Sequence, residues 1–396
     1  MNLVLDKSTW QRVAFGDVID SITDRVDDPS AAGVDRYVGL EHLDPVIMTV
    51  RRWDSPDIVE AQKLRFRSGD VIFGRRRAYQ KKVALAEFEG ICSAHALVLR
   101  ARPGFIDPAF LPVFLSSDYF LDRAIEISVG SLSPTVNWRD LKSQEFVLPP
   151  LDEQKRIADL LWAIERHRLA AADTAESLRA TKSAVFTDRL AAGVEQSGWS
   201  SDSVASLVEA GPTNGKSAPA NDQKRGVPTL SISAVRGGLV KGGDSVKFID
   251  VEPASVDGFL LQEDDFLIVR GNGNRQLTGR GGLVVGGLPT GCIYPDLLIR
   301  LRFNAARMLP QFAAEQWNSA HAHTALLENA KSTNGIWKIN GKDIKSHRLV
   351  VPPLEAQTEL LAEARTFDRS IEATQAEANR LRAVLRTLSS TIFGGN

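Results

Sequence analysis

Residues 147–161 (VLPPLDEQKRIADLL) and residues 350–364 (VVPPLEAQTELLAEA) carry nearly the same sequence at two places in one chain. Leu151 and Leu354 occupy equivalent positions, and 354 − 151 gives an offset of 203 residues. A proline suits the start of a helix, because the N–H group that it lacks has no intrahelical partner there. The two stretches therefore predict two long helices that begin in the same way.

The similarity between the two halves extends upstream of both Pro-Pro pairs. Residues 137–151 (NWRDLKSQEFVLPPL) align with residues 340–354 (NGKDIKSHRLVVPPL) at the same offset. Farther upstream, residues 69–75 (GDVIFGR) match residues 264–270 (DDFLIVR) at an offset of 195. Matches in the same order with slowly drifting offsets indicate a duplication followed by loop insertions. We therefore predict two copies of one module.

The stretch after each Pro-Pro pair carries apolar residues at seven-residue spacing, and residues 151–190 contain neither Gly nor Pro. Such seams, sustained over about five heptads, favour long helices packed side by side. Periodicity alone also permits a homodimeric coiled coil, whereas the duplication allows the two helices to pair within one chain. The residues expected to pack the helices together or to dock a partner are Ile157, Ile164, Leu178, Val185, Leu360, Phe367, Ile371, Leu381, Leu385 and Leu388.

The residues before each helix form short β-branched and aromatic runs broken by Gly, Pro, Asp and Asn, which is typical of a strand-rich domain. We predict an α+β fold in which two similar strand-rich domains are joined by two long antiparallel paired helices, with internal pseudo-two-fold symmetry. The expected boundaries are 1–148 and 193–350 for the two domains, and 149–192 and 351–396 for the two helices.

Composition narrows the class of protein. The chain has 396 residues, is 43% hydrophobic and has a net charge of −1, so its overall charge does not indicate a nucleic-acid partner. The only cysteines, Cys92 and Cys292, are too few for a disulfide framework and fit a reducing compartment. We find no apolar run of membrane-spanning length and no signal-peptide pattern, so we expect a cytoplasmic protein without a membrane partner.

The sequence lacks the usual catalytic and cofactor motifs. It contains no P-loop, no H-E-x-x-H, no G-x-S-x-G and no Cys/His ligand cluster. In the glycine-rich residues 271–282, Gln276 stands where G-x-G-x-x-G requires its third glycine. Glu153 and Lys155 match half of a nuclease motif, but an acid is expected in the first turn of a helix. We therefore expect a binding and assembly subunit without a metal, a cofactor or a catalytic site of its own.

Equivalent places in the two halves carry polar residues after a predicted strand. Arg and Lys side chains can contact phosphates, and Arg can bind guanine through two hydrogen bonds. The alternative is that these segments are solvated loops with no partner. In the first half the candidates for DNA contact are Arg75, Arg76, Arg77, Lys81, Lys82, Asn137 and Arg139. In the second half they are Arg270, Asn272, Asn274, Arg275, Arg280, Lys331, Asn334 and Lys338.

Together these features resemble the specificity subunits of type I restriction–modification systems over essentially the whole chain. The resemblance rests on residues 37–44 (YVGLEHLD), residues 130–161 and their second-half counterpart, residues 332–357. It is the repeated order of a polar loop, Asp-Leu/Ile-Lys, Pro-Pro-Leu and a long helix that makes the pattern specific. The second copy departs from the first at Ala356, where the first copy has Glu153.

The resemblance implies a function and a set of partners. Each strand-rich domain would be a target recognition domain that reads one half of a bipartite site in double-stranded DNA. The paired helices would set the spacer and dock two methyltransferase subunits, which bind S-adenosylmethionine, and motor-nuclease restriction subunits would complete the complex. The competing hypotheses are a coiled-coil scaffold with two protein-binding domains and no DNA role, and a nuclease that uses Glu153 and Lys155.

Overall fold

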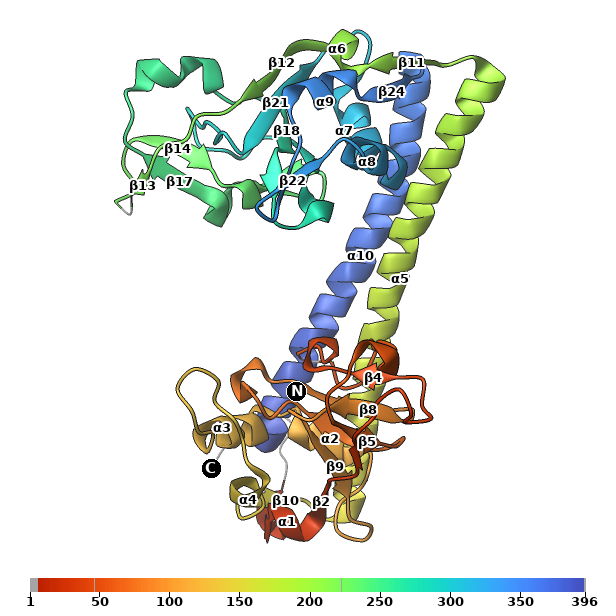
Figure 1. The fold of residues 1–396 in the computed structure, drawn as a ribbon, viewed down its shortest axis with the longest axis vertical. Helices are drawn as coiled ribbons and strands as arrows, with labels where there is room; N and C mark the ends of the chain where they lie inside the picture. Colours follow the sequence, from red (N-terminus) through yellow and green to blue (C-terminus); the bar gives the residue numbers. More distant parts are fainter. Residues whose placement is uncertain (1–5, 46, 222, 395–396) are drawn as a thin grey trace. The chain divides into compact units, whose positions relative to one another are not determined.

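The computed structural model describes residues 6–45, 47–221 and 223–394. The chain forms two compact units: unit 1 consists of residues 1–173 and 374–396, and unit 2 of residues 174–373. Two long helices, α5 (Leu151–Ser197) and α10 (Leu354–Phe393), contribute a segment to each unit (Figure 1). Each unit therefore contains a globular part and a stretch of both helices.

Unit 1 is built from mainly antiparallel sheets, in which only β4 pairs in parallel, with β8, among the named strands, and short helices surround these sheets. One sheet is the pair β1 (Gln11–Ala14) and β10 (Glu145–Leu148). The two four-stranded sheets have the order β2 (Ile19–Ile22), β9 (Leu97–Ala101), β6 (Val71–Phe73), β7 (Val83–Leu85), and the order β3 (Arg25–Val26), β5 (Lys63–Phe66), β8 (Gly90–Ser93), β4 (Tyr37–Val38). The short helices are α1 (Phe15–Val18), α2 (Phe110–Leu115), α3 (Asp118–Glu126) and α4 (Trp138–Leu141), with 3-10 turns at η1 (Lys7–Thr9), η2 (Leu40–His42), η3 (Pro56–Ile58) and η4 (Ala78–Gln80).

Unit 2 follows the same plan with a larger sheet. The pair β11 (Ser200–Ser203) and β24 (Arg348–Val351) is the counterpart of β1 and β10. The six-stranded sheet has the order β12 (Val208–Asn214), β21 (Leu298–Phe303), β18 (Phe266–Val269), β20 (Gly281–Leu283), β16 (Leu239–Val240), β15 (Val235–Arg236). The three-stranded sheets are β13 (Ala220–Asn221), β17 (Val246–Ile249), β14 (Val227–Leu230), and β19 (Gly271–Asn272), β23 (Ile336–Lys338), β22 (Lys331–Thr333). The short helices are α6 (Val204–Leu207), α7 (Pro310–Asn318), α8 (Ala320–Leu327) and α9 (Gly341–Ser346), with 3-10 turns η5 (Ile232–Ala234), η6 (Gly243–Ser245), η7 (Pro253–Phe259) and η8 (Arg275–Leu277).

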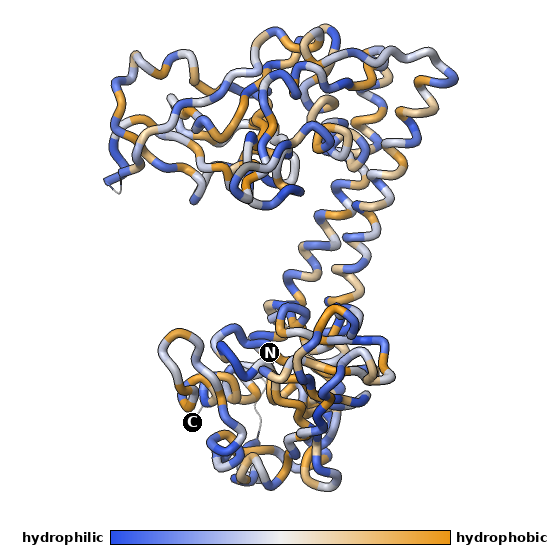
Figure 2. Tube along the Cα trace, viewed as in Figure 1, coloured by the Kyte–Doolittle hydropathy of each residue, from blue (hydrophilic) through white to orange (hydrophobic). Residues whose placement is uncertain are grey.

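Each unit encloses an aromatic core into which a long helix inserts side chains. In unit 1, Phe15, Phe114 and Phe146 lie in a buried cluster that also takes in Phe393 from the end of α10. In unit 2, the corresponding core receives Phe186 from α5. Hydrophobic stretches lie within both globular parts, and the two long helices alternate between hydrophilic and hydrophobic residues along their length (Figure 2). Burial of these apolar faces is what joins each helix to its globular part.

The two long helices run antiparallel. In unit 1, His167 Nε2 of α5 lies 3.2 Å from Glu377 Oε1 of α10. In unit 2, Lys182 is paired with Asp368, and Arg189, farther along α5, is paired with Glu363, which comes earlier in α10. As the residue number rises along α5, the residue number of its partner on α10 falls, which is the pattern of antiparallel helices. The predicted α+β fold with paired antiparallel helices is confirmed.

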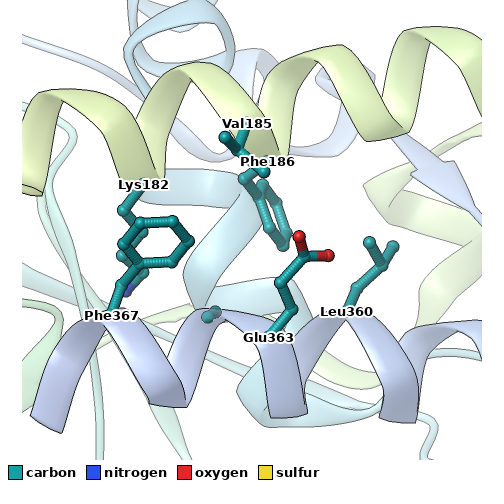
Figure 3. A pocket seen from close by; sticks show the side chains of 7 residues that line it. Lys182, Val185, Phe186, Leu360, Glu363 and Phe367 are labelled. Atoms are coloured by element: carbon teal, nitrogen blue, oxygen red, sulfur yellow. The ribbon is translucent and has the colours of Figure 1, made fainter.

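The residues of the predicted seam are buried or half-buried. Ile157, Leu360 and Ile371 are buried. The remaining seam residues are half-buried, namely Ile164, Leu178, Val185, Phe367, Leu381, Leu385 and Leu388. In unit 2, Val185 and Phe186 project from α5 toward Leu360 and Phe367 of α10 (Figure 3), leaving a cavity of about 10 Å³. That space holds one water molecule at most, so the contact is closely packed.

The duplication extends to the hydrogen bonds of the helix starts. In unit 1, buried Gln154 accepts a bond from Asp107 N at 2.8 Å and donates to the Pro149 carbonyl at 2.9 Å. In unit 2, Gln357 accepts from Leu309 N and donates to the Pro352 carbonyl, both at 2.8 Å. Buried backbone groups require such partners. The glutamine repeated after each Pro-Pro pair therefore fastens the helix start to the loop that precedes α2 or α7.

A buried carboxylate directly before a core strand is also repeated in the two units. Asp70, at the start of β6, receives Arg100 at 2.6 and 2.7 Å. Asp265, at the start of β18, receives Arg302 at 2.6 and 3.3 Å. Both carboxylates also accept the backbone N–H of the residue three positions earlier. These two-pronged pairs fix the strand that leads into each candidate recognition loop described below.

Candidate nucleic-acid interface

In unit 1, two loops lie against each other and form one surface, which we call loop pair 1 (residues 74–82 and 129–137). Arg77 N donates to the Pro134 carbonyl at 2.7 Å, and Val136 N donates to the Arg75 carbonyl at 2.9 Å. The first loop turns sharply because Arg77 and Lys81 have φ angles of 56° and 52°. These backbone bonds give the surface a defined conformation.

Several basic side chains of loop pair 1 are occupied within the protein. Lys81 Nζ lies 2.5 Å from Asp118 Oδ1 and 3.6 Å from Asp122 Oδ1, and these acids raise the pKa of the lysine although its burial opposes them. Lys82 Nζ donates to the Leu40 carbonyl at 2.5 Å. The Nε atom of Arg75 is buried and has no hydrogen-bond partner among the described residues. Lys81 and Lys82 are therefore engaged in bonds within the protein, and the Arg75 side chain is partly buried.

Two arginines of loop pair 1 remain exposed. The side chain of Arg76 makes no hydrogen bond or ion pair with any residue that the structure describes, and Arg77 has only a 3.4 Å contact from Nε to Ser133 Oγ. Asn137 and Arg139, at the start of α4, both contact Asp140, at 3.4 and 3.1 Å. Of the residues predicted in this half, Arg76 and Arg77 are thus the freest to meet an external partner.

Unit 2 has an equivalent surface, loop pair 2 (residues 270–280 and 331–338). The strand pairing of Gly271 with Lys338 joins the first loop to the hairpin of β22 and β23. The guanidinium carbon of Arg275 lies 4.9 Å from the ring centre of Trp337, and its Nη2 donates to the Leu327 carbonyl at 3.3 Å. Arg275 therefore braces the two segments against each other.

The side chains of loop pair 2 divide into internal braces and exposed groups. Arg280 donates to the Gln276 and Asn318 carbonyls at 3.2 and 2.8 Å, and burial lowers the pKa of its guanidinium. The side-chain oxygens of Asn272 and Asn274 accept backbone N–H groups two residues on, and Arg270 reaches the Asp296 carbonyl at 3.5 Å. The predicted residues that are exposed and make no side-chain hydrogen bond within the described chain are Lys331, Asn334 and Lys338.

Sequence reasoning missed the apolar residues on these surfaces. Tyr79 and Leu132 in loop pair 1 are 53% and 91% exposed. Leu277 and Ile336 in loop pair 2 are 50% and 42% exposed. A leucine carries no sequence signal for exposure, although the Gly-Ser-Leu-Ser-Pro sequence around Leu132 is typical of a turn and would have indicated it.

The described residues contain no group of three or more His, Cys, Asp or Glu side chains placed to hold a metal ion. Within the same residues, no helix combines the length and apolar character that crossing a membrane requires. Glu153 accepts a hydrogen bond from Trp10 Nε1 at 3.2 Å, which gives this acid a structural partner.

Comparisons with known proteins agree on one family. Residues 7–174 match the family model described as the type I restriction modification DNA specificity domain. The chain is 27% identical to the type I restriction enzyme EcoKI specificity subunit of Escherichia coli (strain K12), over 77% of this chain and 68% of that protein. It is 23% identical to the StySPI specificity subunit of Salmonella potsdam, over 76% of this chain and 67% of that protein.

Solved structures show the same fold. A chain from a study of assembly and conformational transition in the type I R-M system matches 98% of this chain and 97% of its own length, with a TM-score of 0.57 and 21% identity. The S subunit of a type I restriction-modification system from M. genitalium matches 100% of this chain and 99% of its own length, with a TM-score of 0.54 and 14% identity. Residues 7–174 therefore carry the type I restriction modification DNA specificity domain, and the chain as a whole is similar to type I specificity subunits in sequence and in fold.

Proposed function

We propose that each unit of this chain reads one half of a bipartite DNA site, loop pair 1 in unit 1 and loop pair 2 in unit 2. One observation carries the proposal: equivalent positions on two copies of one scaffold present different exposed polar side chains. Loop pair 1 offers Arg76 and Arg77, whereas loop pair 2 offers Lys331, Asn334 and Lys338. Two such surfaces suit two different half-sites.

The exposed side chains of the two loop pairs suit contacts with different bases. Arg76 and Arg77 can bind guanine edges or phosphates through two N–H groups each. Asn334 can form paired hydrogen bonds with adenine, while Lys331 and Lys338 act as point charges toward phosphates. As a specificity subunit the chain recognises DNA and does not catalyse a reaction, so the competing hypothesis of a scaffold without a DNA role gains no support from its relatives.

The partners follow from the same proposal. Two methyltransferase subunits, which bind S-adenosylmethionine, would dock on the long helices, and motor-nuclease restriction subunits would join them in the cytoplasm. Among the predicted seam residues, Ile157, Leu360 and Ile371 are buried and are therefore not free for docking. Leu151, Leu160 and Leu354 on the helices are 40 to 43% exposed and offer apolar contacts near the helix starts.

The decisive experiment exchanges one module. Residues 1–145 are replaced by the corresponding region of another specificity subunit, and the methylated sites are mapped by methylome sequencing in a host that carries the partner genes. We expect one half-site to change while the other half-site stays the same. A change in both half-sites, or in neither, would contradict separate reading by the two units.

A second experiment tests the exposed arginine. Arg76→Ala should weaken binding of the complex assembled with its methyltransferase subunits to its own DNA site and lower the slope of log affinity against log salt by about one. The matched control is Arg25→Ala, since Arg25 is also exposed and makes no side-chain hydrogen bond or ion pair with the described residues but lies outside loop pair 1. Equal effects of the two substitutions would remove Arg76 from the interface.

A further inference from the structure

Leu132 is the most exposed large apolar side chain among the described residues, at 91%. It lies at the tip of a closed turn, because Val129 and Thr135 exchange backbone hydrogen bonds at 3.1 and 2.9 Å. Gly130 at the base has a φ of 112°, and Thr135 Oγ1 donates to the Ser133 carbonyl at 3.0 Å. The turn therefore holds an apolar side chain in water, where leaving it exposed forgoes a favourable burial.

The turn that carries Leu132 is fixed to the basic part of loop pair 1. Arg76 forms a strand-like bridge with Thr135, and Arg77 bonds the Pro134 carbonyl at 2.7 Å. Arg77 Nε also contacts Ser133, the residue next to Leu132, at 3.4 Å. DNA drawn to these arginines would therefore meet Leu132 as well, with a serine on each side of it.

We propose that Leu132 contacts the C5-methyl group of a thymine in the major groove and so determines part of the half-site read by unit 1. This inference rests on the proposed function and specifies one base, a thymine, of the half-site that unit 1 would recognise. The major groove, about 12 Å wide, admits a turn, and the thymine methyl is the apolar group among its base-edge atoms. Ser131 and Ser133 can donate to or accept from neighbouring base edges.

The equivalent turn of unit 2 is built differently, which confines the effect to one half-site. The hairpin of β22 and β23 turns at Asn334 and Gly335, with φ angles of 51° and 76°. Its exposed tip is therefore polar, and the exposed large apolar side chains of loop pair 2, Leu277 and Ile336, are only 50% and 42% exposed, against 91% for Leu132. Thymine-methyl contact of this kind is expected from loop pair 1.

The experiment removes the thymine methyl group from the DNA and changes the Leu132 side chain of the protein, each separately. The complex of the full chain with its methyltransferase subunits is titrated with duplexes of its mapped site in which each thymine of the unit 1 half-site is replaced in turn by uracil. One uracil should weaken wild-type binding about fourfold, the value of one buried methylene-sized group. Leu132→Ala should bind the thymine duplex about fourfold more weakly and lose the difference between thymine and uracil, whereas Leu132→Met should keep it.

The control and the contrary outcomes are distinct. Phe105→Ala removes an apolar side chain that is 60% exposed elsewhere in unit 1 and should preserve the thymine preference. A unit 1 half-site without thymine on either strand would overturn the proposal, and so would weaker binding by Leu132→Ala without any wild-type response to uracil. Absence of sequence-specific binding in the wild type would instead contradict the proposed function itself.

Discussion

The two units differ at their surfaces and agree inside. Asp70 with Arg100 in unit 1 corresponds to Asp265 with Arg302 in unit 2, bond for bond. The loops that follow these buried carboxylates share almost no side chain. Polar groups that satisfy buried backbone atoms are costly to replace, whereas exposed side chains are not. The comparison indicates that the repeated scaffold carries stability and the loops carry specificity.

The largest expected effect comes from removing the shared carboxylates. Asp70→Ala and Asp265→Ala should each lower the free energy of unfolding by about 3 kcal/mol, because each substitution leaves an arginine without its carboxylate and a backbone N–H without its acceptor. This loss lies at the lower end of the range for breaking a buried ion pair, because the Arg100 and Arg302 side chains are 26% and 24% exposed. Urea denaturation measures the loss, and hydrogen exchange assigns it to one unit.

The control for this pair is Asp28→Ala. Asp28 is exposed and accepts hydrogen bonds only from near neighbours in the chain, chiefly Ser30, so its loss should leave the free energy of unfolding nearly unchanged. If only one of Asp70 and Asp265 proved important for stability, the two equivalent ion pairs would not stabilise their units equally, which would contradict the comparison.

A difference inside the scaffold predicts a pH effect confined to unit 2. His347 occupies the position of Gln144 in unit 1, is 9% exposed, and its Nε2 has no hydrogen-bond partner within the described residues. Burial, with smaller contributions from His321 and His323, lowers its pKa to about 4. The unfolded chain therefore binds a proton that the folded chain does not, and stability falls as the pH drops from about 6.5 toward 4, by up to about 3 kcal/mol.

The test of this difference is His347→Gln, which installs the residue of unit 1. It should flatten the dependence of unfolding free energy on pH in that window, leaving the smaller contribution of His323, whose pKa burial also lowers. Hydrogen exchange at pH 7 and pH 5 should show acid-induced opening in unit 2 of the wild type. The idea fails if the variant keeps the full slope.

The repeated glutamines should have matching, intermediate effects. Gln154→Met and Gln357→Met preserve side-chain volume but remove the bonds to Asp107 N and Leu309 N, and each should cost about 2 kcal/mol of unfolding free energy. Gln196→Met, at an exposed position of α5, is the control. Unequal costs in urea denaturation would show that the two helix starts are held by different forces.

The sequence contained the helices and the repeat, because periodicity and Pro-Pro junctions are local signals. It did not contain the end of α5, which continues to Ser197 through Gly193, where the ring of Trp199 leaves no room for a Cβ. Nor did it show that Lys81 is paired with Asp118, 37 residues away. Which basic side chains of a loop remain free depends on their tertiary neighbours. For this reason the sequence predicted Arg76, Arg77, Lys81 and Lys82 alike, whereas the structure leaves only the two arginines without a strong internal partner.

The smallest expected effect concerns the one clear mismatch of the helix starts, Glu153 against Ala356. Glu153 bonds Trp10 Nε1 at 3.2 Å, whereas Trp199, the counterpart of Trp10, donates no side-chain hydrogen bond to the described residues and packs on Gly193 instead. Glu153→Ala should therefore lower the free energy of unfolding by about 1 kcal/mol or less and speed amide hydrogen exchange in the paired strands β1 and β10. Asp152→Ala is the matched control, since both acids sit in the first turn of α5 and share its dipole, but Asp152 contacts only Arg156 at 3.5 Å. Only the difference between the two variants measures the Trp10 bond, and a zero difference would mean that unit 1, like unit 2, holds its tryptophan by packing alone.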